Sequence, residues 1–167
     1  HQRLQARGGW LVLDQAFVEG EPGHGLEPWA GAPGLILLRS LGKFFGLAGM
    51  RAGAVLAEPE LTRALAFELG PWTVSGPARY LMARALADRA WQIEALGRLQ
   101  TSRLRMDGLL RKSGMPATNG TLLFRTVHHE NAAPIADELA RRAILVRRFD
   151  EPPALRFGLP PDESGWQ

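Results

Sequence analysis

The sequence contains no cysteine, which excludes a disulfide framework, a zinc site with thiolate ligands and catalysis by a thiol. It also lacks any uninterrupted apolar run near the roughly 20 residues that a membrane-spanning helix needs. The chain begins at His1 without a methionine or a secretory leader. We therefore expect a cytoplasmic protein without a membrane partner, of which this chain is a fragment.

Lysine is nearly absent, since only Lys43 and Lys112 occur among the 20 basic residues, and 17 acidic residues leave a net charge of +3. The arginines are spread along predicted helices and do not form the basic stripe with interleaved aromatics that nucleic-acid binding needs. We therefore expect no nucleic-acid partner. Because lysine is so scarce, the presence of Lys43 in a particular segment is a stronger indication that this residue has a function.

Short apolar runs alternate with helical patterns, which predicts an α/β fold. We expect strands at 10–13, 35–38 and 54–57, the first of them buried on both faces. Residues 19–34 are rich in glycine and proline and are expected to form a loop. Helices are predicted over 59–69 and over 77–112, the second broken near Ala90 and Trp91. Shorter elements follow, namely strands at 121–126, 144–148 and 154–158 and a helix at 134–142. No internal repeat was found.

Polar residues follow two of the predicted strands, where open α/β sheets build their sites. Asp14 ends the first strand, and Lys43 follows the second in a glycine-rich segment between Ser40 and Arg51. Because apolar residues flank this segment, we expect Lys43 to be buried, which would lower its pKa and let a neutral amine attack an aldehyde. A hydroxyl, the backbone N–H groups of a glycine loop and a guanidinium can hold a phosphate. An aldehyde and a phosphate on one ligand describe pyridoxal phosphate (PLP).

Other interpretations have weaker support. Ser40-x-x-Lys43 also matches the nucleophile motif of penicillin-binding proteins and β-lactamases, but the accompanying S-x-N and K-T-G elements are missing. A P-loop is excluded, because Phe44 follows Gly42-Lys43 where a hydroxyl residue is required. His128 and His129 are adjacent in a predicted extended segment, face opposite ways and lack a third ligand, so no metal site is expected.

Three motifs resemble those of the PLP-dependent aminotransferases of classes I and II, which have the aspartate-aminotransferase fold. The segment from Ser40 to Arg51 resembles S-x-x-K…G-x-R, the run from Asp14 to Phe17 resembles D-x-A-[YF], and Leu155-Arg156-Phe157-Gly158-Leu159 resembles L-R-[IF]-x-[LV]. The resemblance implies that Asp14 pairs with the pyridine nitrogen and that Lys43 forms the Schiff base. It further implies that Ser40 and Arg51 hold the cofactor phosphate, and that Arg156 binds the substrate carboxylate.

The resemblance also implies an architecture. Residues 1–90 would be the C-terminal part of the PLP-binding large domain, with a mainly parallel sheet, and residues 91–167 a small C-terminal α/β domain. Family members are usually homodimers, so a homodimer is expected. The family's aromatic stacking residue, its asparagine near the ring oxygen and its glycine turn for the phosphate have no counterpart in this chain, so the fragment alone is expected to be inactive.

Two departures favour one branch of the family. Phe17 stands where many relatives carry a tyrosine that donates to the cofactor, and Gly42 where histidinol-phosphate aminotransferases carry a serine. With the segment 70–77, these features resemble threonine-phosphate decarboxylases of cobalamin biosynthesis, which act on a phosphorylated amino acid. In that branch Arg147, preferred to Arg148, would bind the substrate phosphate. Trp72 is a further candidate for stacking on the cofactor. Two alternative functions are a histidinol-phosphate-type aminotransferase and a non-catalytic fragment that acts in binding or assembly.

Overall fold

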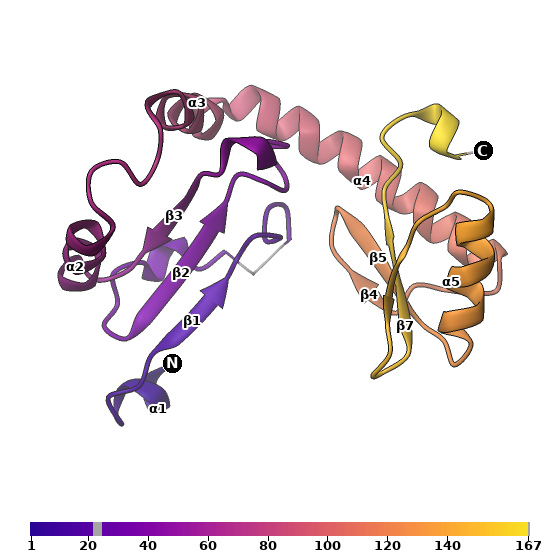
Figure 1. Ribbon diagram of the computed structural model, residues 1–167, viewed down its shortest axis with the longest axis horizontal. Coiled ribbons are helices and arrows are strands. Elements are labelled where there is room, and N and C mark those ends of the chain that lie inside the picture. The colour runs from indigo at the N-terminus through magenta and orange to yellow at the C-terminus, as the bar shows by residue number, and fades with distance from the viewer. Residues whose placement is uncertain (22–24, 167) are drawn as a thin grey trace. The chain divides into compact units, whose positions relative to one another are not determined.

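The computed structural model describes residues 1–21 and 25–166. These residues form two compact units, unit 1 from His1 to Arg89 and unit 2 from Ala90 onward (Figure 1). Both units combine helices with a sheet, so the predicted α/β class is confirmed. Within the described ranges, no helix is both long enough and apolar enough to cross a membrane.

Unit 1 contains a three-stranded sheet in the order β1-β2-β3. β1 (Leu11–Asp14) runs parallel to β2 (Leu35–Ser40), which pairs antiparallel with β3 (Gly53–Leu56). The three apolar runs thus form strands as predicted. Leu35 and Leu37 of β2 are buried on one face of this sheet.

The expectation that β1 is buried on both faces is wrong. Val12 is 53% exposed. Trp10 and Val55, which lie on the same face of the sheet, are also partly exposed. Side chains alternate between the two faces of a strand, and the described side chains of unit 1 leave this face open.

The helices of unit 1 begin and end at the residues that the sequence marks. α1 (Gln2–Gln5) precedes β1, and the 3₁₀ helix η2 (Ala48–Met50) precedes β3. α2 (Pro59–Leu69) has its proline in the first turn, and Gly70 ends it with a positive φ of 74°. α3 (Gly76–Ala87) is capped by Ser75, whose Oγ accepts from the Ala78 N–H at 3.3 Å.

Two expectations are met with small differences. The predicted long helix is interrupted at Asp88, whose ψ of 79° is not helical, so the break lies two residues before the expected Ala90. The stretch predicted as loop contains the 3₁₀ helix η1 (Glu27–Trp29), and its residues 22–24 lie outside the described part of the chain.

Unit 2 is built on α4 (Arg89–Lys112) and an antiparallel sheet in the order β4-β5-β7-β6. Its strands are β4 (Asn119–Gly120), β5 (Phe124–His128), β6 (Arg147–Phe149) and β7 (Ala154–Gly158). α5 (Ala132–Arg141) packs against β6 and β7, and η3 (Glu163–Trp166) ends the described chain. Met106 and Leu110 of α4 form the core with Val127 of β5.

Two strands of unit 2 begin later than predicted. Thr121 to Leu123 form a tight turn, closed by a bond from the Thr121 N–H to the Phe124 carbonyl, so β5 starts at Phe124. Ala143 takes a left-handed φ of 61°, and the Ile144 N–H bonds to the Leu139 carbonyl at 2.9 Å. This bond and the left-handed Ala143 close the end of α5, and β6 therefore starts only at Arg147.

Candidate functional site

β1 and β2 bring two predicted site residues to one edge of the sheet in unit 1. The strands are parallel, so Asp14 and Ser40 lie near their shared carboxyl end. Asp14 pairs in register with Leu38, which puts its side chain on the same face as that of Ser40 two residues later. The Gln15 N–H donates to the Leu38 carbonyl at 2.8 Å and extends this pairing past the strand.

Asp14 is exposed, and its Oδ1 accepts a hydrogen bond from the Ala16 N–H at 2.9 Å. This bond turns the chain directly after β1 and fixes the carboxylate at the end of the strand. The same turn leads to Phe17.

The segment after β2 is a compact turn anchored by two apolar residues. Leu41 and Phe44 are only 2% and 8% exposed, and the Leu47 N–H bonds back to the Leu41 carbonyl at 3.0 Å. The Ser40 Oγ accepts from the Gly42 N–H at 3.1 Å. A Cβ on Gly42 would lie 3.2 Å from the Ala48 Cα, so a side chain at this position would require Ala48 to shift slightly.

Lys43 is exposed, and the expectation that it is buried is wrong for this chain. Leu41 and Phe44 take the inward positions of the turn and direct Lys43 outward. Its Nζ lies 5.2 Å from the centroid of the Phe17 ring, a cation–π contact that joins the loop after β1 to the loop after β2. The amine is therefore held beside an aromatic ring and stays accessible to an aldehyde.

Arg51 adopts a left-handed conformation, with a φ of 50°. For a residue with a long side chain this costs on the order of 1 kcal/mol, and such strain gathers at functional sites. Arg51 follows η2 directly and is exposed. The strain agrees with a functional position for this guanidinium.

The residues of unit 1 fit the chemistry of PLP. A carboxylate and a hydroxyl lie at the carboxyl ends of β1 and β2, and an accessible amine and a guanidinium lie on the segment that follows β2. They match the cofactor's aldehyde, ring nitrogen and phosphate in charge and in hydrogen-bonding type. The individual roles of Asp14, Phe17, Ser40, Lys43 and Arg51 stay predictions.

In unit 2, Arg147 of β6 lies directly opposite Arg156 of β7. Directly paired residues share a face, so both side chains project from the same face of the sheet. Arg156 stacks over the Phe124 ring at 4.9 Å and Arg147 over the Phe149 ring at 5.6 Å, measured from the guanidinium carbon to the ring centroid. Like charges directly opposite one another destabilise a sheet. Two arginines paired in this way are therefore expected where an anion binds between or beside them.

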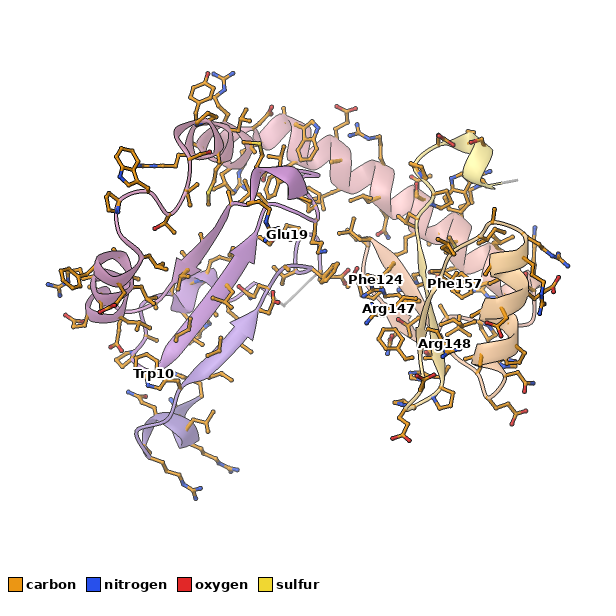
Figure 2. All side chains as sticks on the ribbon, in the orientation of Figure 1. Trp10, Glu19, Phe124, Arg147, Arg148 and Phe157 are labelled. Atoms are coloured by element: carbon orange, nitrogen blue, oxygen red, sulfur yellow. The ribbon has the colours of Figure 1, made fainter. Side chains whose placement is uncertain are left out.

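Arg148 lies on the other face of the sheet. It pairs in register with the buried Leu155, and its Nε lies 3.1 Å from Asp150 Oδ1. Figure 2 shows Phe124 and Arg147 on one side of this sheet and Phe157 and Arg148 on the other.

The sequence did not reveal one cluster in unit 1. Arg39 of β2 forms ion pairs with Glu19 and with Glu27, both from the connection between β1 and β2. The signal that could have indicated this cluster is the position of Arg39, a single arginine near the end of an apolar strand and directly before the segment that contains Lys43.

Two further candidates receive little support. Trp72 is 90% exposed. His129 accepts the Asn131 N–H on its Nδ1 at 3.0 Å and so supports the start of α5. Across residues 1–21 and 25–166, histidine, aspartate and glutamate do not gather in any group that could hold a metal ion.

The comparisons with known proteins agree with these motifs. The family model of aminotransferase class I and II matches residues 1–164. A threonine-phosphate decarboxylase of Pseudomonas aeruginosa is 49% identical over 99% of this chain and 50% of its own length, and one of Sinorhizobium sp is 42% identical over 98% and 49%. A histidinol-phosphate aminotransferase of Syntrophotalea carbinolica is 29% identical over 90% of this chain and 44% of its own length.

Among solved structures, the histidinol-phosphate aminotransferase of Sinorhizobium meliloti in complex with pyridoxal-5'-phosphate is 27% identical, with a TM-score of 0.80 over 92% of this chain and 45% of that chain. The chain belongs to the class I and II aminotransferase family. The predicted family is thereby confirmed, as is PLP as the cofactor that the family and this relative indicate. The chain spans about half the length of the curated relatives it matches.

Proposed function

We propose that the chain forms the C-terminal half of a PLP-dependent lyase that decarboxylates L-threonine O-3-phosphate to aminopropanol phosphate in cobalamin biosynthesis. The main support is the 49% and 42% identity to two threonine-phosphate decarboxylases over nearly the whole chain. Under this proposal, unit 1 corresponds to part of the PLP-binding large domain and unit 2 to the small domain.

The arginine pair of unit 2 supports a substrate with two anionic groups. Phospho-threonine carries a carboxylate and a phosphate, and Arg147 and Arg156 lie opposite one another on one face of the sheet. We assign the carboxylate to Arg156 and the phosphate to Arg147. The two charges orient the substrate and so select which bond at its α-carbon breaks.

The residues of unit 1 act on the cofactor and on a proton. When bound, PLP supplies the electron sink for the electron pair released at the α-carbon. Asp14 keeps the ring nitrogen protonated, while Ser40 and Arg51 hold the phosphate. Lys43 would hold the cofactor through Nζ until the substrate amine takes its place, and the freed ammonium would then deliver the proton that replaces carbon dioxide on the α-carbon. Phe17 packs against the Lys43 amine, as the 5.2 Å contact indicates.

A histidinol-phosphate-type aminotransferase is the second candidate, supported by relatives at 29% identity and by the solved structure at 27%. A serine at position 42, the feature of those enzymes, would have to displace Ala48, which approaches Gly42 closely. This packing favours the decarboxylase. A homodimer in the cytoplasm is part of the proposal.

Incubating the full-length protein and PLP with phospho-threonine tests this function. Carbon dioxide and aminopropanol phosphate should form without a keto-acid acceptor. Turnover of histidinol phosphate that depends on an acceptor, without release of carbon dioxide from phospho-threonine, would replace the proposal by the second candidate. Absence of both reactions would leave only the non-catalytic role in binding or assembly.

A further inference from the structure

The Glu19–Arg39–Glu27 cluster lies beside the candidate cofactor residues of unit 1. Arg39 directly precedes Ser40 in β2, and the alternation of the strand directs its side chain to the opposite face of the sheet. Its Nη2 donates to Glu19 Oε1 at 2.6 Å, and its Nη1 pairs with Glu27 Oε1. The side chains of Arg39 and Glu19 are only 21% and 10% exposed, whereas that of Glu27 is 44% exposed.

Both carboxylates come from the connection that leads from β1 to β2. Glu19 follows Phe17 by two residues, and Phe17 carries the contact with the Lys43 amine. Figure 2 shows Glu19 at the end of the sheet where β1 and β2 terminate, away from Trp10 at the other end. The ion pair therefore fastens the loop after Asp14 to the strand that leads to Lys43.

We propose that Arg39 is a positioning residue, which acts through Glu19 to fix the Phe17 ring and with it the Lys43 amine relative to Asp14. This inference rests on the proposed cofactor role of Lys43. Arg39 itself lies on the other face of the sheet from Ser40, so the proposal gives it no contact with the cofactor. It determines how well the two loops are aligned when the cofactor binds.

The chemistry of the cluster requires arginine. Two different guanidinium nitrogens serve two carboxylates, and a lysine ammonium cannot span both in the same fork geometry. Glu19 is mostly withdrawn from water, so loss of its partner leaves a poorly solvated charge. Glu27 is nearly half exposed, and its pairing is worth less.

The test uses the full-length protein and the variants Arg39→Lys, Glu19→Gln and Glu27→Gln. Arg63→Gln is the matched control, because Arg63 forms an ion pair with Glu60 in the same unit, with both side chains more than 70% exposed. The readouts are the PLP dissociation constant, the pH midpoint of the visible absorbance of the lysine-bound cofactor, and the melting temperature without PLP.

We expect Arg39→Lys and Glu19→Gln each to weaken PLP binding about tenfold, the effect of a small misplacement of positioned groups, and to shift the pH midpoint. Glu27→Gln should change binding by less than about threefold and Arg63→Gln by less than about twofold, as exposed pairs do. If Arg39→Lys does not fold, Glu19→Gln gives the decisive result, since it keeps the size and an acceptor oxygen.

A lower melting temperature with an unchanged PLP dissociation constant and pH midpoint would overturn the inference, because the cluster would then only hold the fold together. That result leaves the proposed function intact, since the unsubstituted protein would still show a band reducible by borohydride. Absence of the band from the unsubstituted protein would overturn the proposed function and this inference together.

Discussion

The two groups of candidate residues are held in different ways. In unit 1, Asp14 ends β1, whereas Phe17 and Lys43 lie on the loops that follow β1 and β2, and contacts such as that between the Lys43 amine and the Phe17 ring align these loops. In unit 2, Arg147 and Arg156 lie on paired strands, and the register alone places them opposite one another on one face of the sheet. Loop positions depend on many weak contacts, whereas a strand register is fixed by the backbone ladder. In unit 1, substitutions of residues that support the loops, such as Arg39, should therefore affect cofactor binding indirectly. In unit 2, we expect large effects mainly from substitutions of the two arginines themselves.

The largest effect is expected from Lys43→Ala, which should abolish the visible absorbance of the bound cofactor. The amine is the atom that binds the aldehyde, and alanine offers no substitute. Absorbance spectroscopy of the full-length protein with PLP measures this. Lys112→Ala, the control within this chain, should keep the band, and a Lys43→Ala protein that also keeps it would refute the assignment.

Arg156→Ala should lower kcat/KM for phospho-threonine about a hundredfold, the loss expected when one partner of a desolvated charge pair is removed. The cofactor spectrum should stay the same, because Arg156 serves the substrate. Arg148→Ala is the control, since Arg148 lies on the other face and pairs with Asp150, and it should change kcat/KM by less than about threefold. Equal effects of the two substitutions would contradict the role of the strand face.

Arg51→Gly distinguishes the effect of the backbone strain at position 51 from the contribution of the Arg51 side chain to PLP binding. Glycine accepts the left-handed φ of 50° freely, so the protein without PLP should become no less stable, and gain up to about 1 kcal/mol. PLP binding should nevertheless weaken about tenfold, because a charge-assisted bond to the phosphate is lost. Ala143→Gly, at a φ of 61° in unit 2, should relieve strain without weakening PLP binding. Unchanged PLP binding by Arg51→Gly would remove Arg51 from the site.

Gly42→Ala should give the smallest effect, a loss of about 1 kcal/mol in the free energy of unfolding, because its Cβ would lie 3.2 Å from the Ala48 Cα. Gly49→Ala is the matched substitution in the same segment, since a Cβ there meets nothing within 4 Å. Denaturant unfolding of the protein without PLP compares the two. Equal stabilities of the two variants would show that the turn tolerates a side chain at position 42.

The sequence predicted those features that depend on local patterns. Apolar runs placed the three strands of unit 1, Pro59 and Gly70 marked the ends of α2, and the family motifs led to the confirmed family. The alternation of side chains along a strand distinguished Arg147 from Arg148, and the register puts these two arginines on opposite faces.

Features that depend on tertiary packing were not predictable. The exposure of Lys43 follows from which residues of its turn point inward, and the motif contains no information about that. The exposure of Val12 depends on what covers the sheet, and the ion pairs of Arg39 join residues 20 and 12 positions apart. The late start of β6 reflects the left-handed Ala143, an unusual conformation for alanine.

The most direct test is to reduce the full-length protein with borohydride in the presence of PLP and to locate the pyridoxyl group by peptide mass spectrometry. We predict that the peptide containing Lys43 carries the label and that the peptide containing Lys112 does not. A label on another lysine, or no label under conditions in which a known family member is labelled, would contradict the assignment of Lys43 as the cofactor lysine.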